Sequence, residues 1–94
     1  MTTQWNFELL VKPAAVPLTE GPVWDGEFLF FTHIQASRIM CYDPKSGAIT
    51  VAREGTNRTN GLAHDEQGRL YGCCSGGRSV VRFDQDTITT LCDK

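Results

Sequence analysis

The 94-residue sequence has no run of basic residues, no long apolar stretch and no signal-peptide pattern in its first residues. Nine Lys and Arg residues stand scattered against eleven Asp and Glu, so the basic stripe that nucleic-acid phosphates require is missing. The longest apolar stretches, such as residues 28–31, are far shorter than the roughly 20 residues of a membrane span. The first residues lack the charged and apolar regions of a secretion signal. These absences predict a cytoplasmic protein that binds neither nucleic acid nor membranes.

The four cysteines, at positions 41, 73, 74 and 92, form no CxxC pair and have no histidines at zinc-finger spacing. We therefore expect all four to be reduced. Cys73 and Cys74 are adjacent, and neighbouring side chains of a strand point to opposite faces of the sheet. One of the two should therefore be buried as a small apolar residue, and the other should lie near the surface.

An internal repeat with a period near forty residues is the strongest positive signal. TEGPVWD at residues 19–25 matches TNGLAHD at residues 59–65, so that glycine recurs at 21 and 61 and aspartate at 25 and 65. After a short insertion, residues 26–30 match 68–72, and residues 38–43 match 79–84. A period of this length is typical of the four-stranded blades of a β-propeller.

Each repeat is predicted to form four short strands, because apolar runs alternate with Gly, Pro and Asp clusters and no segment keeps a helical period. The expected strands are residues 21–24, 28–32, 38–42 and 48–53 in the first unit and 61–64, 70–74, 79–83 and 87–91 in the second. Another alternating pattern, over residues 5–11, predicts an extra N-terminal strand that would close a propeller ring.

The repeat predicts an all-β chain that forms the first two blades of a truncated β-propeller. Residues 1–18 would be the N-terminal strand and linker, residues 19–58 the first blade and residues 59–94 the second. Two blades are too few to close a ring. We therefore expect poor autonomous folding, self-association through exposed blade edges, and an unpaired apolar face on the second blade that includes Leu70, Val80 and Phe83.

Glu20 and Asn60 occupy equivalent positions of the repeat, at the start of each expected inner strand. Inner strands of successive blades start beside one central channel, so both side chains are expected to approach a common axis. Both carry oxygen donors and precede a glycine, and Ca²⁺ prefers about six to eight such oxygens. The alternative interpretation is local, with Glu20 as an exposed turn residue before Pro22 and Asn60 in an Asx turn.

Five stretches of the chain resemble the first two blades of the gluconolactonase and regucalcin (SMP-30/gluconolactonase/LRE-like) family. They are TEGPVW at 19–24, LFFT at 29–32, SRIM at 37–40, GTNRTNGLA at 55–63 and GRLY at 68–71. The resemblance implies a six-bladed propeller with one divalent cation in its channel, which hydrolyses sugar lactones. In that family the glutamate of the EGP motif is a metal ligand, and this role carries over to Glu20. Asn60 corresponds to a second-blade position that lines the mouth of the substrate pocket.

The function implied by this resemblance is a metal-dependent sugar-lactone hydrolase with Ca²⁺ or Zn²⁺, or else Mg²⁺ or Mn²⁺, as the cation. Two positions depart from the family pattern, since His33 stands where aspartate is common and Cys74 where glutamate is common. The family's other ligands and its general acid or base lie in later blades, so no catalytic residue is assigned in this chain. We expect the chain alone to be inactive, and the alternative function is a non-catalytic propeller fragment or binding scaffold.

Overall fold

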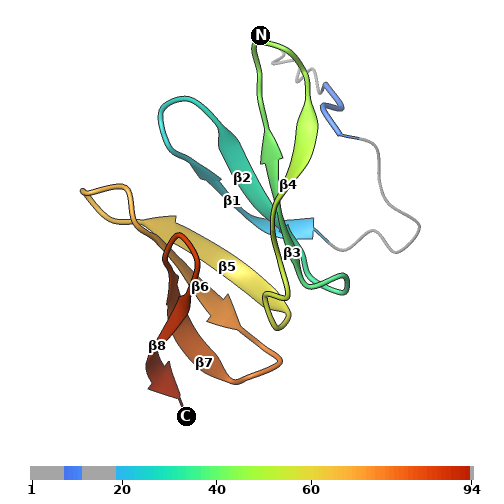
Figure 1. Cartoon of the computed structure of the whole chain (residues 1–94). Helices are drawn as coiled ribbons and strands as arrows, with labels where there is room; N and C mark the ends of the chain where they lie inside the picture. The colour runs from blue at the N-terminus through green and yellow to red at the C-terminus, as the bar shows by residue number, and fades with distance from the viewer. Residues whose placement is uncertain (1–7, 12–18, 94) are drawn as a thin grey trace, which may run out of the picture.

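The computed structural model describes residues 8–11 and 19–93, which contain eight strands in two four-stranded sheets. The first sheet holds β1 (Thr19–Trp24), β2 (Leu29–His33), β3 (Arg38–Tyr42) and β4 (Ile49–Glu54), and the second holds β5 (Thr59–His64), β6 (Leu70–Cys74), β7 (Ser79–Phe83) and β8 (Ile88–Asp93). Each sheet is an antiparallel meander, and Figure 1 shows the two sheets beside each other. The eight strands predicted within the two repeats are confirmed, with ends that differ by no more than two residues.

Turns between the first and second strands of each sheet are built by equivalent aspartates of the repeat. Asp25 accepts hydrogen bonds at Oδ1 from the main-chain N–H groups of Glu27 (2.8 Å) and Phe28 (2.7 Å). Asp65 accepts them in the same way from Gln67 (2.9 Å) and Arg69 (3.0 Å). Aspartate is favoured in turns because its short carboxylate reaches main-chain donors a few residues further on.

The repeat extends to the irregularities of the two sheets. The register between β3 and β4 shifts after Ile39, and the register between β7 and β8 shifts after the equivalent Val80. Ser37 and Arg78, which end the turns before β3 and β7, have positive φ angles of 53° and 52°. Because bulges and left-handed turn positions recur together, the two sheets are two copies of one structural unit.

The two sheets pack through β5, which lies against β1 and β2 of the first sheet. Ile39 is 0% exposed at this contact and packs with Cys74, Val81 and Phe83 of the second sheet. Burial of a side chain of this size contributes about 1.5 to 3 kcal/mol. The core of the described chain therefore lies between the sheets rather than within either one.

The expectation that Leu70, Val80 and Phe83 share one unpaired apolar face is wrong for two of the three. Phe83 is 6% exposed in the core cluster with Ile39 of the first sheet, and Leu70 is half-buried and packs against this cluster. Val80 is 38% exposed. Val80 and Phe83 are separated by an odd number of positions in β7, and strand side chains alternate, so they point to opposite faces.

The predicted N-terminal strand falls partly outside the described residues, which omit 1–7 and 12–18. The described part, residues 8–11, does not form a strand. Leu10 and Val11 instead line a cavity of about 400 Å³ together with Phe31 and Met40 of the first sheet. The ring-closing role of this segment stays a prediction. None of the described residues forms a helix long and apolar enough to cross a membrane.

Candidate functional site at the start of the inner strands

The starts of β1 and β5 are held together by one buried hydroxyl group. Thr32, 0% exposed on β2, places its Oγ1 3.0 Å from the main-chain oxygen of Glu20 and 3.1 Å from that of Asn60. Because both oxygens lie within hydrogen-bonding distance of the same hydroxyl, they are at most about 6 Å apart. The structure therefore brings together the main chains of the two residues that the sequence indicated.

Gly21 permits this close approach of the two inner strands. Its φ angle is +60°, in the left-handed region that favours glycine. A Cβ atom at this position would overlap the main-chain oxygen of Asn60 and would lie 3.1 Å from the main-chain nitrogen of Leu62. The glycine that follows Glu20 thus serves the packing of one sheet on the other.

Both candidate residues lie at β-bulges. In the pairing of β1 with β2 the register shifts between Glu20 and Val23, and in the pairing of β5 with β6 it shifts between Thr59 and Gly61, which leaves Asn60 as the extra residue. Bulges change the direction of side chains and are frequent beside active sites. Glu20 is exposed and Asn60 is half-buried.

The Glu20 carboxylate is available for a ligand, in contrast to the carboxylates of Asp65 and Asp84. Among the described residues it makes no hydrogen bond or ion pair, whereas Asp65 binds Arg69 Nε at 2.6 Å and Tyr71 Oη at 2.8 Å. Desolvation raises the pKa of Asp65, but the hydrogen bonds from Arg69 and Tyr71 outweigh it and lower the pKa well below its usual range. Asp84 likewise accepts a hydrogen bond from Arg82, and this hydrogen bond lowers the pKa of Asp84.

The oxygen atoms at the start of the inner strands are of the chemical type that binds a hard cation, but there are few of them. Carboxylate and amide oxygens are ligands that Ca²⁺ prefers, in sets of about six to eight. Glu20 and Asn60 offer one such side chain each. No group of three or more His, Cys, Asp or Glu residues that could hold a metal ion occurs in the part of the chain that the structure describes. The described residues therefore fit part of a cation site.

The two departures from the family pattern lie on β2 and β6. Cys74 is 4% exposed, and its Sγ lies 3.0 Å from Thr59 Oγ1. This polar contact is buried where the two sheets pack together. His33 is half-buried beside the cavity that Leu10 and Val11 also line. Neither position adds an acidic ligand to the candidate site.

The cysteines follow the expectation from the sequence. Cys73 is exposed and Cys74 is buried, as their alternation in a strand predicted, and all four cysteines are free. Burial raises the pKa of the Cys41 thiol, which keeps it in the protonated, unreactive form.

Two features beside Asn60 were missed in the sequence. Thr32 carries the link between the strands, and nothing in its local pattern distinguishes it from an ordinary strand threonine. Asn57 and Arg58, between β4 and β5, have positive φ angles of 52° and 57°. The tolerance of asparagine for the left-handed region was the one available signal there.

The segment of Asn57 and Arg58 is tied to both sheets. The main-chain oxygens of Asn57 and Arg58 accept N–H groups of the β6–β7 turn at 3.1 Å each, and Arg58 N–H donates to Ser37 Oγ at 3.1 Å. Left-handed non-glycine residues often cluster at functional sites, where the surrounding structure holds them. The segment directly precedes β5, so it lies beside Asn60 at the same end of the inner strand.

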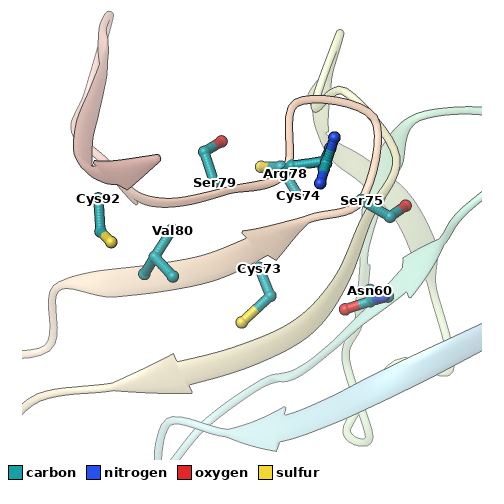
Figure 2. Close-up of a pocket in the computed structure, with 8 residues that line it drawn as sticks. All are labelled: Asn60, Cys73, Cys74, Ser75, Arg78, Ser79, Val80 and Cys92. Carbon is teal, nitrogen blue, oxygen red and sulfur yellow. The ribbon is translucent and has the colours of Figure 1, made fainter. Parts of the chain in front are cut away.

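Asn60 also lines an open pocket of about 290 Å³ on the second sheet (Figure 2). Cys73, Val80 and Cys92 line it from three successive strands, and Glu20 is not among its lining residues. The pocket is therefore distinct from the space between the two candidate ligands. It lies on the face of the second sheet that is turned away from the first.

Two antiparallel meanders that repeat each other and pack through their inner strands are two blades of a β-propeller. The profile of the SMP-30/gluconolactonase/LRE-like family matches residues 18–94. The chain belongs to this family, and the predicted fold class is confirmed.

Solved structures show the same blades. A gluconolactonase from Xanthomonas campestris, described as important in glucose secondary metabolic pathways, matches with a TM-score of 0.78 and 30% identity over 90% of this chain and 29% of that one. A second protein, provisionally described as a gluconolactonase, matches with a TM-score of 0.70 and 22% identity over 81% of this chain and 27% of that one, a likeness of fold alone. The chain spans less than a third of either protein. No curated protein matches the sequence significantly.

Proposed function

We propose that this chain supplies the first two blades of a sugar-lactone hydrolase that depends on a divalent cation. The observation that supports this proposal is the adjacency of Glu20 and Asn60 at the start of β1 and β5, in a member of the gluconolactonase family. Glu20 would be a ligand of the cation, and Asn60 would line the mouth of the substrate pocket. The preferred cations are Ca²⁺ and Zn²⁺, with Mg²⁺ and Mn²⁺ as alternatives.

In lactone hydrolysis, water adds to the lactone carbonyl carbon and the ring C–O bond breaks, which yields the open hydroxy acid. A divalent cation, when bound, supplies Lewis-acid polarisation of the carbonyl. The Glu20 carboxylate would contribute negative charge that helps to hold such an ion. The Asn60 amide offers both a donor and an acceptor for sugar hydroxyl groups. The base that activates the water is assigned to other blades of the ring.

For the 94-residue chain by itself, we propose a second function, a non-catalytic propeller unit or binding scaffold. The small number of oxygen ligands favours it, because Glu20 and Asn60 fall well short of a full coordination sphere. We expect no lactone hydrolysis above the uncatalysed rate with any of the four cations. Isothermal titration calorimetry should give a dissociation constant for Ca²⁺ in the millimolar range or weaker, and micromolar affinity would contradict this proposal.

A chimera tests the role of Glu20. Residues 19–93 would replace the matching blades of the Xanthomonas gluconolactonase, and hydrolysis of gluconolactone would be followed by acid release at limiting and saturating metal. Glu20→Gln should raise the metal concentration needed for half-maximal activity by about tenfold or more, since it removes a carboxylate from the coordination sphere. Glu27→Gln, at an exposed glutamate of the β1–β2 turn, is the control. Unchanged metal dependence in Glu20→Gln would remove this residue from the ligand set.

A further inference from the structure

A cavity of about 410 Å³, here termed the inter-sheet cavity, lies between the two sheets. The first sheet lines it with Phe30 of β2 and Arg53 of β4. The second sheet lines it with His64 and Phe83, the last residues of β5 and β7. Because Asn60 lies at the start of β5, the cavity is at the opposite end of this strand from the candidate cation site. Its volume falls within the range of about 300 to 1,000 Å³ that is usual for small-molecule sites.

Much of the wall of the inter-sheet cavity is apolar. Ile39 and Phe83 are 0% and 6% exposed, and Phe30 and Leu70 beside them are half-buried. The His64 ring meets Phe30 edge to face, with 5.8 Å between the ring centroids. Both His64 nitrogens are inaccessible to solvent, so its carbon atoms form this part of the wall. Aromatic walls of this kind favour a flat apolar ligand, because rings pack well by stacking or edge to face.

Arg53 brings a positive charge to this apolar cavity. Its Cζ lies 5.3 Å from the centre of the Phe83 ring, a cation–π contact that holds the half-buried side chain over the aromatic face. The guanidinium makes no hydrogen bond or ion pair with any residue that the structure describes, whereas Arg38 of the same sheet pairs with Glu54 at 3.3 Å. Because a guanidinium presents a planar fork of N–H donors, Arg53 is suited to bind a carboxylate.

The other charges on this side of the inter-sheet cavity are paired. Arg69 lines the cavity and forms an ion pair with Asp65 at 2.6 Å. Asp84 also lines the cavity and forms an ion pair with Arg82 at 2.8 Å. Each pair is neutral as a whole, so the charge of Arg53 is left in excess.

We propose that the inter-sheet cavity binds a small organic carboxylate with an aromatic or branched apolar body. The carboxylate pairs with the Arg53 guanidinium, and the apolar body packs against Phe30 and Leu70. The exposed carboxylate of Asp25, which also lines the cavity, disfavours ligands with a second negative charge, such as phosphate esters. This site is separate from the proposed lactone site, since the sugar acid formed there carries many hydroxyl groups and does not suit apolar walls.

Titration with benzoate tests the proposal on the 94-residue chain and on the chimera described above, because both contain the two walls of the cavity. Of the two histidines in the sequence, His64 lines the inter-sheet cavity, and His33 lines the cavity beside Leu10. In NMR spectra of the chain, benzoate should shift the imidazole signals of His64 and not those of His33. The binding should saturate, with a dissociation constant in the millimolar range.

Three further ligands separate the parts of benzoate that are recognised. Acetate lacks the ring, benzyl alcohol lacks the charge and gluconate lacks the apolar body. Each should bind at least about tenfold more weakly than benzoate. In the chimera, saturation-transfer difference NMR of the same ligands should give the same order, with the unmodified Xanthomonas gluconolactonase as the control.

Variants of the first sheet test the role of Arg53. Arg53→Gln should weaken benzoate binding by about tenfold or more, because it removes the charged donors. Arg38→Gln is the matched control, since Arg38 is an arginine of the same sheet that does not line the inter-sheet cavity. Ala52→Phe places a ring in the cavity from an exposed position and should abolish binding. Circular dichroism of each variant reports whether the strands are retained.

Three results would overturn the proposal. A titration that fails to saturate in both proteins would show that the cavity takes no such ligand. Benzoate that shifts His33 as much as His64, or that binds the folded Arg53→Gln variant with unchanged affinity, would place its binding elsewhere on the chain. Glu20→Gln and removal of divalent cations with EDTA should leave benzoate binding unchanged, which separates this proposal from the metal-binding role of Glu20.

Discussion

Ile39 and Val80 hold the same position in two sheets built on one plan, yet Ile39 is 0% exposed and Val80 is 38% exposed. Both are apolar, both lie in the third strand of their sheet, and both precede the same register shift. The difference comes from β5, which covers the first sheet and has no counterpart on the second among the described residues. The core of a blade is therefore completed by the sheet that packs on it.

The largest expected effect is on the buried side of this comparison. Ile39→Ala should lower the free energy of unfolding by about 2 to 5 kcal/mol, because it removes a buried side chain and leaves a cavity. Val80→Ala should cost less than about 1 kcal/mol in dilute protein, since Val80 already contacts water. Urea denaturation of both variants measures the difference, and equal losses would show that the second sheet does not cover Ile39 in solution.

Gly21 and Gly61 offer the next comparison. Gly21→Ala should lower the free energy of unfolding by about 2 to 4 kcal/mol, the sum of a left-handed residue with a Cβ and the overlap with Asn60. At the equivalent Gly61 no atom lies within 4 Å of an added Cβ, so Gly61→Ala should change stability by no more than about 0.5 kcal/mol. Thermal unfolding of the two variants distinguishes them, and a tolerated alanine at 21 would argue against the close approach of β1 to β5.

The third expected effect concerns the Thr32 hydroxyl group, which lies between the main-chain oxygens of Glu20 and Asn60. Thr32→Val keeps the shape of the side chain and removes the donor that faces two main-chain oxygens, which should cost about 1 to 3 kcal/mol. Thr32→Ser keeps the hydroxyl and should retain the hydrogen bond. At the equivalent exposed position, Cys73→Val should be nearly neutral at low protein concentration. Denaturation curves that placed the valine and serine variants of Thr32 at the same stability would contradict this account.

The smallest expected effect is on the stability of the folded chain in acid, where the two turn aspartates, Asp25 and Asp65, should contribute differently. A carboxyl group whose pKa is lower in the folded chain stabilises it above the unfolded pKa of about 3.9, and this contribution is lost as the pH falls toward the folded pKa. The pKa of Asp25 is lowered first by the hydrogen bond from Phe28, whereas Asp65 also has an ion pair with Arg69. Stability should therefore fall below about pH 4, and Asp65→Asn should flatten this dependence more than Asp25→Asn.

The strands and the repeat were predictable because their signals are local. Apolar alternation and turn residues such as Asp25 and Asp65 place the strand ends to within two residues. The adjacency of Glu20 and Asn60 was expected from their equivalence in the repeat, and their main chains do lie together. Their roles toward a cation and a substrate stay predictions.

Other features of the site could not be predicted in this way. Thr32 links the inner strands only because β5 packs next to β2. Its partner Asn60 is nearly thirty positions away in the chain. Phe83 and Val80 were expected on one face because both are apolar. The alternation of side chains places them on opposite faces, and only the position of the neighbouring sheet decides which face is covered.

The sequence by itself determined an all-β chain of two repeated units and the pair of oxygen-bearing residues at the start of their inner strands. These properties depend on patterns that span a few residues or one repeat. The tertiary structure alone decided that Ile39 and Thr32 are buried while Val80 and Cys73 remain uncovered. The physical reason is that solvent exposure depends on the distance between two sheets, which Gly21 and the packing of β5 set, and not on the apolar character of any one strand.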